Sequence, residues 1–196
     1  MTEKKKFLTD IDNCVLSWSS HLKEYLILNH PELEINENLD PFKLYPNILD
    51  AHWEKFNETK DFEELTPLRD AQEYIQKICD LGYSFVGISS CLPNSNMKTY
   101  YEVRKKRLKN LEMLFPGCFE DCICIGVGKS KIDKLSKYES TYWVEDKTSN
   151  AIDGFELGHK TFLMKHVYNE EDTTPESSLK VDNWGNIYDV VLKDNS

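Results

Sequence analysis

Short apolar runs alternate with segments of helical periodicity along most of the chain. Runs rich in β-branched and aromatic residues are typical of buried strands, and they lie at 6–10, 83–88, 122–126, 141–144 and 159–164. Apolar residues three or four positions apart predict helices at 17–30, 68–81, 97–114, 131–138 and 148–157, with a polar loop at 166–183 and a short helix or strand at 184–192. This alternation predicts a doubly wound α/β fold, a parallel sheet with helices on both faces.

The alternation is interrupted between residues 31 and 66. That segment carries three prolines, many acidic residues and scattered aromatic residues. Because its aromatic content is too high for a disordered linker, we expect short helices and loops there. Together with the preceding helix it predicts a small helical cap, residues 17–66, inserted after the first strand of a Rossmann-like core formed by 1–16 and 67–196.

Composition narrows the classes of partner. A formal net charge of −10 over 196 residues argues against general electrostatic binding of a nucleic-acid polymer or a membrane surface. The basic run at 104–107 is expected to be a solvated helix face. No secretory or transmembrane segment is visible, so we expect a cytoplasmic protein. The sequence does not predict the oligomeric state.

The six cysteines are expected to be buried, reduced thiols, because most of them sit beside apolar residues. Cys118, Cys122 and Cys124 form a cluster that raises the alternative of a zinc site. No fourth ligand has suitable spacing nearby, and structural zinc sites use four ligands in recognisable pairs.

Two carboxylates, Asp10 and Asp12, follow the first apolar run. In an extended strand, residues two apart point to the same face. Two carboxylates at the end of an apolar strand are costly unless a cation offsets their charge, and oxygen ligands suit a hard cation such as Mg²⁺. The alternative is a polar turn after an edge strand.

Two later strands also end in polar residues. Ser89 and Ser90 follow the run at 83–88, and Glu145 and Asp146 follow the run at 141–144. In a parallel sheet, ligands bind outside the carboxyl ends of the strands. The convergence of these residues on that edge favours a binding site over a polar turn.

The order of these motifs resembles the haloacid dehalogenase (HAD) superfamily. The matching segments are 10–15, 87–90, 131–135 and 144–150, and the resemblance covers roughly residues 6–165. The chain departs from the family pattern at Asn13, where the family usually has Gly, and at Cys14, where it usually has Thr or Val. These departures are expected to affect the turn more than the chemistry.

The resemblance implies a Mg²⁺-dependent phosphatase that acts through an aspartyl-phosphate on a small phosphoester. Asp10 would be the nucleophile, and Asp12 would be first the general acid and then the base. Ser89 would bind a phosphoryl oxygen, with Asn13 and Ser90 beside it. Lys131 would neutralise developing charge; Lys129 remains an alternative for this role.

The resemblance also implies a metal site. Asp146 would bind Mg²⁺ together with Asp10 and the backbone carbonyl of Asp12, and Glu145 and Asn150 would complete or support that shell.

Within the superfamily, the chain is most similar to the 5′(3′)-deoxyribonucleotidases, which share a helical cap after the first motif. The segment 161–169, followed by Trp184, also resembles them. This implies a (deoxy)nucleoside 5′-monophosphate as substrate, with Trp18, Tyr45 and Trp53 of the cap stacking on the base. The alternative is that these aromatic residues form the core of the cap itself.

The sequence also leaves other functions open. The substrate could instead be a sugar phosphate or a phosphoamino acid. A receiver-like signalling domain uses similar residue types, but its acidic pair comes first in the chain. A non-catalytic phosphate-binding domain is a further alternative, against which the complete set of carboxylates, serine and lysine argues.

Overall fold

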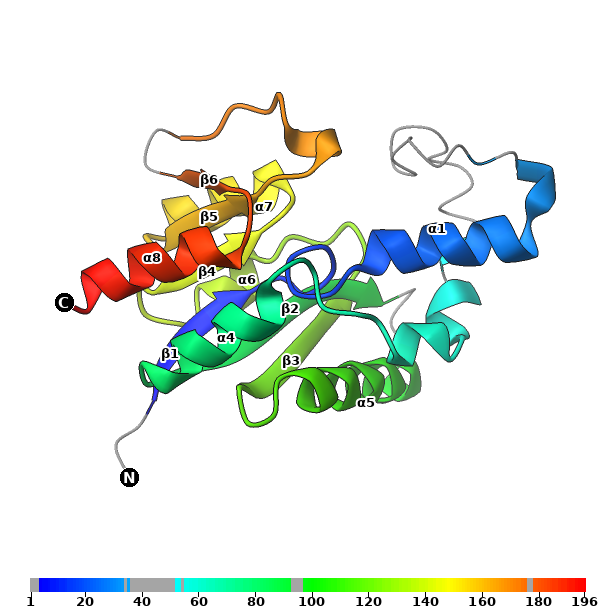
Figure 1. The fold of residues 1–196 in the computed structure, drawn as a ribbon, viewed down its shortest axis with the longest axis horizontal. Helices are drawn as coiled ribbons and strands as arrows, with labels where there is room; N and C mark the ends of the chain where they lie inside the picture. Colours follow the sequence, from blue (N-terminus) through cyan, green and yellow to red (C-terminus); the bar gives the residue numbers. More distant parts are fainter. Residues whose placement is uncertain (1–3, 34, 36–51, 54, 93–96, 176–177) are drawn as a thin grey trace.

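The computed structural model describes residues 4–33, 35, 52–53, 55–92, 97–175 and 178–196. Within these residues the centre of the protein is a six-stranded sheet in the order β3-β2-β1-β4-β5-β6 (Figure 1). The strands are β1 (Lys5–Thr9), β2 (Tyr83–Leu92), β3 (Phe119–Gly126), β4 (Tyr142–Glu145), β5 (Lys160–Met164) and β6 (Leu179–Val181). All neighbouring strands pair in parallel. The predicted doubly wound α/β fold is confirmed.

The central strand β1 is covered on both faces. Phe7 and Leu8 are both fully buried, and they belong to two different hydrophobic clusters on opposite sides of the sheet. Burial on both faces explains why these strands are continuous apolar runs rather than alternating ones.

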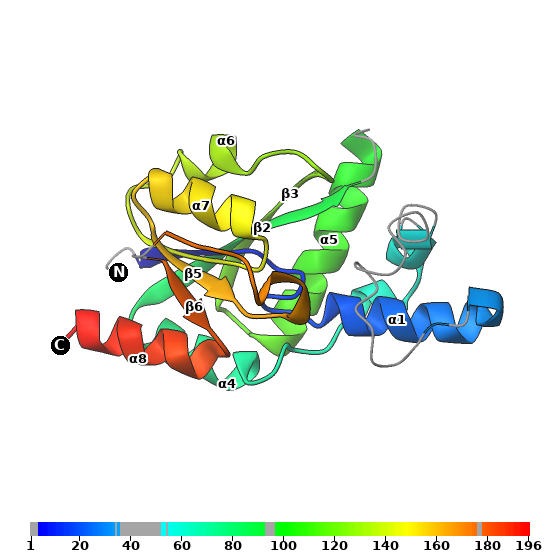
Figure 2. The same ribbon diagram turned by 90° about the horizontal axis from the view of Figure 1, so that it is seen from above.

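Helices form the two outer layers (Figure 2). The face of Phe7 is covered by α4 (Ala71–Asp80), α5 (Met97–Leu114) and α8 (Trp184–Asp194). The face of Leu8 is covered by α6 (Ile132–Leu135) and α7 (Thr148–Glu156). The helix predicted at 97–114 has those bounds in the structure.

The described part of the insertion between β1 and α4 packs on the core. It contains α1 (Trp18–Asn29) and two 3₁₀ turns, η1 (Pro31–Leu33) and η2 (Asp61–Glu63). Leu22 of α1 and Phe62 of η2 are fully buried in the same cluster as Phe7. The insertion therefore begins and ends on the sheet core, next to the carboxyl end of β1.

The segment at 166–183 was predicted to be a loop, and this is wrong for part of it. It contains a 3₁₀ turn, η3 (Val167–Asn169), and the edge strand β6, which pairs with β5. A strand of three residues is too short to leave a hydrophobic period in the sequence. The last segment, left open as helix or strand, is the helix α8.

The six cysteines are all free and buried, as predicted. Among the described residues, the structure contains no helix with the length and apolar character required to cross a membrane.

Candidate active site

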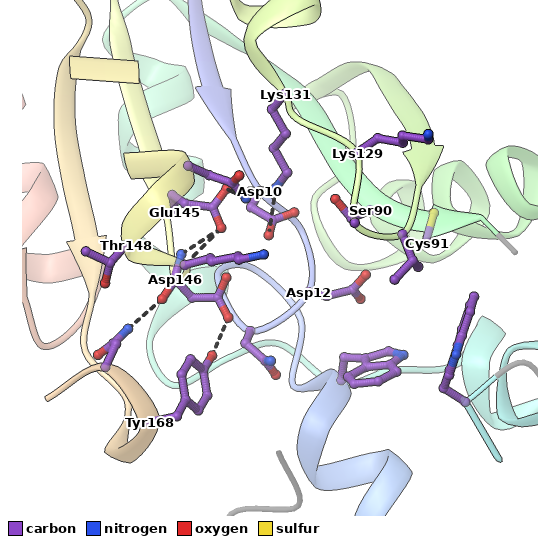
Figure 3. A pocket seen from close by; sticks show the side chains of 18 of the residues that line it. Asp10, Asp12, Ser90, Cys91, Lys129, Lys131, Glu145, Asp146, Thr148 and Tyr168 are labelled. Carbon is purple, nitrogen blue, oxygen red and sulfur yellow. Dashed lines mark hydrogen bonds and ion pairs between the residues drawn. The ribbon is translucent and has the colours of Figure 1, made fainter. Parts of the chain in front are cut away.

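A cavity of about 560 Å³ lies at the carboxyl ends of β1, β2 and β4 (Figure 3). It brings together most of the residues predicted from sequence: Asp10, Asp12, Asn13, Trp18, Trp53, Ser90, Lys131, Glu145, Asp146, Asn150 and the alternative Lys129. Ser89 is not among the lining residues, and Tyr45 lies outside the described residues.

A buried ion-pair network forms the floor of this cavity. The ammonium of Lys131 lies 2.9 Å from Asp10 Oδ2 and 2.8 Å from Glu145 Oε2. Lys131 is only 1% exposed, and Glu145 is fully buried. Asp10 also accepts a hydrogen bond of 2.7 Å from the backbone N–H of Ile11 through Oδ1. The network joins the ends of β1 and β4 to the start of α6.

Charge balance in this network sets the protonation of its members. Burial lowers the pKa of Lys131, but the negative charges of Asp10 and Glu145 outweigh burial and raise it. Burial would raise the pKa of Glu145, whereas Lys131 and the hydrogen bonds to its carboxylate lower it overall. The pKa of Asp10 is raised by burial, against the opposing effect of Lys131. Lys131 is therefore a charged ammonium between two acids.

The two candidate lysines occupy different positions. Lys131 points at Asp10, whereas the exposed Lys129 extends sideways at the rim (Figure 3). Because Lys131 pairs with Asp10, the geometry favours Lys131 over Lys129 as the lysine that would neutralise developing charge.

The chemistry of the acidic residues fits a hard cation. Ligand atoms of Asp10, Cys14 and Asp146 lie within 4.8 Å of one another. Burial raises the pKa of the Cys14 thiol well above its usual value, so Cys14 is a neutral thiol and a poor ligand for Mg²⁺. Burial and the charge of Glu145 raise the pKa of Asp146 to about 8. The three acids around one ammonium cannot all be ionised without an excess of negative charge, which a bound cation would offset.

Glu145, predicted to support the metal shell, is oriented by the protein. Its Oε1 accepts from the backbone N–H groups of Asp146, at 3.1 Å, and Lys147, at 3.0 Å. Its Oε2 accepts from Asn150 Nδ2 at 3.2 Å and from Lys131. Glu145 thus fixes the loop that carries Asp146, and Asn150 holds Glu145.

Sequence reasoning missed a second set of residues, on η3. The hydroxyl of Tyr168 donates to Asp146 Oδ2 (Figure 3). The ring of Tyr168 stacks on His166 with centroids 5.0 Å apart and planes 3° apart. The Asn169 side chain donates to the backbone oxygen of Asp146 at 2.6 Å. Since this segment was predicted to be a loop, no periodicity indicated that it would position Asp146.

Asn13 adopts the backbone conformation that its turn requires. Its φ is 60°, in the left-handed region where Gly is usual and Asn is the best-tolerated alternative. Its side-chain Oδ1 accepts a 3.0 Å hydrogen bond from the backbone N–H of Ser19 in the first turn of α1. Asn13 therefore replaces the expected Gly at a small conformational cost and adds a tie to α1.

The two serines at the end of β2 point in different directions. Ser89 is fully buried, and its hydroxyl donates to Asp12 Oδ2 at 2.9 Å. Ser90 lines the cavity. Because successive residues of a strand alternate faces, Ser90 faces the cavity, whereas Ser89, predicted to bind a phosphoryl oxygen, contacts the carboxyl group of Asp12 instead.

Two tryptophans line the cavity from the insertion. The indole N–H of Trp18 donates to Asn57 Oδ1 at 3.3 Å, and its ring lies edge-on to Phe56 with centroids 6.0 Å apart. Trp53 is half-buried. Both rings thus combine packing with a surface that faces the cavity.

Substitution of Asn13 tests the turn. Asn13→Ala should lower the free energy of unfolding by about 1–3 kcal/mol, because it loses the bond to Ser19 and because Ala tolerates a positive φ less well than Asn. Asn13→Gly should lose less, since Gly accepts that φ. Chemical denaturation of the two variants measures the difference, and an Ala variant as stable as the Gly variant would contradict this description of the turn.

The pH dependence of stability tests the packing of His166. Burial lowers its pKa to about 4, although the hydrogen bond of 2.7 Å between Nε2 and the backbone oxygen of Asn13 opposes that. The unfolded chain therefore binds a proton more readily between pH 4 and the ordinary histidine value of 6.5. The stability contributed by neutral His166 is complete above this window and is lost as the pH falls through it.

The control for His166 is His166→Gln, which keeps an N–H donor and removes the titration. The excess stability of the wild type over this variant should shrink as the pH is lowered through the same window. Equilibrium unfolding of both proteins at several pH values measures it. A difference that does not change with pH would show that His166 is not held neutral.

The chain is similar in sequence to a phage protein and in fold to solved structures. No family model matches the chain. An uncharacterized 32.4 kDa protein of Enterobacteria phage T4 is 26% identical over 202 residues, covering 94% of this chain and 68% of that protein. D,D-heptose 1,7-bisphosphate phosphatase from B. bronchiseptica, complexed with magnesium and phosphate, matches with a TM-score of 0.61 and 12% identity over 97% of this chain and 99% of that one.

Two further solved structures share the architecture. A HAD hydrolase from Bacillus subtilis bound to magnesium matches with a TM-score of 0.58 and 14% identity, over 97% of this chain and 99% of that one. An L-2-haloacid dehalogenase matches with a TM-score of 0.57 and 11% identity, with the same coverage of 97% and 99%. The chain therefore has the fold of the HAD-superfamily hydrolases.

Proposed function

We propose that the protein is a Mg²⁺-dependent phosphatase that hydrolyses a small phosphomonoester through an aspartyl-phosphate on Asp10. The observation that carries the proposal is the ion pair of 2.9 Å between Asp10 and Lys131 at the floor of a cavity that Asp12 also lines. A buried carboxylate held by a lysine, with a second carboxyl two residues away, supplies both a nucleophile and a proton donor.

The first step transfers the phosphoryl group to Asp10. A carboxylate oxygen of Asp10 forms a bond to phosphorus while the bond from phosphorus to the ester oxygen breaks. The electron pair of that bond goes to the ester oxygen, which takes the proton of the Asp12 carboxyl. The charge of Lys131 stabilises the negative charge that develops on the phosphoryl oxygens, and Ser90 lies where it can donate to one of them.

The second step hydrolyses the acyl phosphate. Asp12, now a carboxylate, takes a proton from a water molecule whose oxygen attacks phosphorus. The bond from phosphorus to Asp10 breaks, and its electron pair restores the Asp10 carboxylate. Phosphate leaves with the water oxygen, and Asp12 is again protonated for the next substrate.

Asp10 and Asp146 are the residues we propose as metal ligands, with the backbone carbonyl of Asp12. A bound Mg²⁺ would neutralise charge on the phosphoryl oxygens and offset the excess of carboxylates. Tyr168 and Asn169 hold Asp146 in place for this role through its side chain and its backbone oxygen.

Asp12 favours phosphoester hydrolysis over dehalogenation. A halide is a stable anion and leaves carbon without a proton. An alkoxide leaving group requires one, and a second carboxyl beside the nucleophile provides it. Asp12 is held at both oxygens, by Ser89 and by Arg107, which supports a specific role in proton transfer.

The cavity supports a small substrate. Its volume of about 560 Å³ suits a metabolite rather than a polymer. Trp18 and Trp53 line it and present aromatic surfaces suited to stacking on a nucleobase. We therefore propose a (deoxy)nucleoside 5′-monophosphate, with the insertion at 17–66 acting as a cap. A sugar phosphate or a phosphoamino acid is the alternative substrate.

A phosphate-release assay tests the proposal. Purified protein with Mg²⁺ should hydrolyse at least one member of a panel of nucleotides, sugar phosphates and phosphoamino acids, and a chelator should abolish the activity. Asp10→Asn should lower kcat by about 10³-fold or more, because no nucleophile remains. Asp12→Asn should lower kcat by about 10²-fold or more on alkyl phosphates.

The matched control is Asp80→Asn, which changes a carboxylate on α4 outside the cavity and should leave activity unchanged. Inactivity of the wild type across the panel, or full activity of Asp10→Asn, would overturn the proposed function. The preferred member of the panel identifies the substrate class.

A further inference from the structure

Arg107 lies in an environment that its sequence context did not indicate. It belongs to the basic run at 104–107 of α5, which was predicted to be a solvated face, and for Arg107 that prediction is wrong. Its side chain is fully buried. One turn earlier, the Arg104 side chain is 33% exposed and pairs with Asp121 near the surface at 2.6 Å. The two arginines of the same helix therefore have different roles.

The partner of Arg107 is the candidate acid. Arg107 Nη2 donates to Asp12 Oδ1, and the Ser89 hydroxyl donates to Asp12 Oδ2 at 2.9 Å. The Asp12 side chain is 18% exposed and lines the cavity, whereas both of its partners lie behind it. Two side chains from different elements thus fix both oxygens of one carboxyl group.

The insertion also contacts the guanidinium. Arg107 Cζ lies 3.8 Å from the centroid of the Phe62 ring, a cation–π distance. Phe62 belongs to η2 and is fully buried. The contact with the ring and the bond to Asp12 together define the orientation of the guanidinium plane.

The burial of Arg107 lowers the stability of the folded state. Its Nε and Nη1 have no hydrogen-bond partner among the described residues. Buried donors without acceptors destabilise the folded state, and an apolar side chain often serves a purely structural role better than a buried ion pair. The ion pair with Asp12 is the feature that an apolar side chain would not reproduce.

We propose that Arg107 is a positioning residue for Asp12, which orients the carboxyl group for proton transfer to the leaving oxygen. This inference rests on the proposed function. Guanidinium only donates hydrogen bonds, whereas the Ser89 hydroxyl beside Oδ2 can also accept one. Oδ1 of Asp12 therefore stays a proton-free acceptor, and the transferable proton is carried by Oδ2. In the first step that proton passes from Oδ2 to the ester oxygen. In the second step Oδ2 takes a proton from the attacking water.

Leaving-group dependence separates this role from a structural one. Protonation by Asp12 matters for an alkyl phosphate, whose leaving alkoxide is a strong base, and matters little for 4-nitrophenyl phosphate, whose leaving phenolate is a stable anion. The experiment compares the single-turnover rate on an alkyl phosphate with the burst of nitrophenolate from 4-nitrophenyl phosphate. The burst reports phosphorylation of Asp10 without the need for an acid.

The proteins to compare are the wild type, Arg107→Met, Arg107→Lys and the control Arg104→Met. In Arg107→Met the single-turnover rate on the alkyl phosphate should fall by about 10²-fold, while the nitrophenolate burst is retained. Arg107→Lys keeps a donor for Asp12 and should recover part of the lost rate. Arg104→Met should behave as the wild type on both substrates.

A double variant adds a second readout. Because Arg107 acts through Asp12, Arg107→Met should add little to the loss already caused by Asp12→Asn. Equal loss on both substrates in Arg107→Met and Arg107→Lys, or additive losses in the double variant, would show a structural role and overturn the inference. An unchanged rate in Arg107→Met would also overturn it. Absence of phosphate release by the wild type would instead refute the proposed function.

Discussion

The buried ammonium of Lys131 is the constraint on which the carboxyl edge of the sheet depends. It lies 2.9 Å from Asp10, which follows β1, and 2.8 Å from Glu145, which ends the neighbouring strand β4. Without that charge, two carboxylates would be buried with no cation beside them, a state that proteins avoid by neutralising the acids or by unfolding locally. The backbone reinforces the pair, since the N–H of Asp10 donates to the Val144 oxygen at 2.8 Å.

Segments remote in the chain hold the two acidic loops against this pair. The fully buried Trp184, at the start of α8, donates its indole N–H to the backbone oxygen of Cys14 at 2.8 Å. Asn169 donates to the backbone oxygens of Asp146, at 2.6 Å, and Met164, at 2.9 Å. These side chains satisfy backbone oxygens in turns or, for Met164, at the end of β5. The segments around Asn169 and Trp184 therefore fold back onto the site and tie down its two acidic loops.

The sequence predicts those parts of the fold and the site whose signals lie in a few neighbouring residues. The strands and helices of the core have clear periods, and Asp10, Lys131 and Asp146 lie at strand ends or a helix start where topology brings them together. Ser89 and Ser90 were placed at the right edge, but the face that each presents depends on strand twist and register, which adjacent identical residues do not indicate.

Arg107 and Tyr168 show what local signals miss. Arg107 lies in a basic run that reads as solvent-facing, and its burial depends on Phe62 and Asp12, which come from other parts of the fold. Tyr168 acts from a single 3₁₀ turn that is too short to have a period. In both cases a polar side chain gained its role from a tertiary contact.

The most direct measurement locates the covalent phosphate. Asp12→Asn removes the base for the second step, so with Mg²⁺ and 4-nitrophenyl phosphate the acyl phosphate should accumulate. Borohydride reduction followed by peptide mass spectrometry should find the modification on Asp10, and none should form when Asp10→Asn is added. Phosphate release without a modified aspartate, or modification of Asp146 instead of Asp10, would contradict the mechanism.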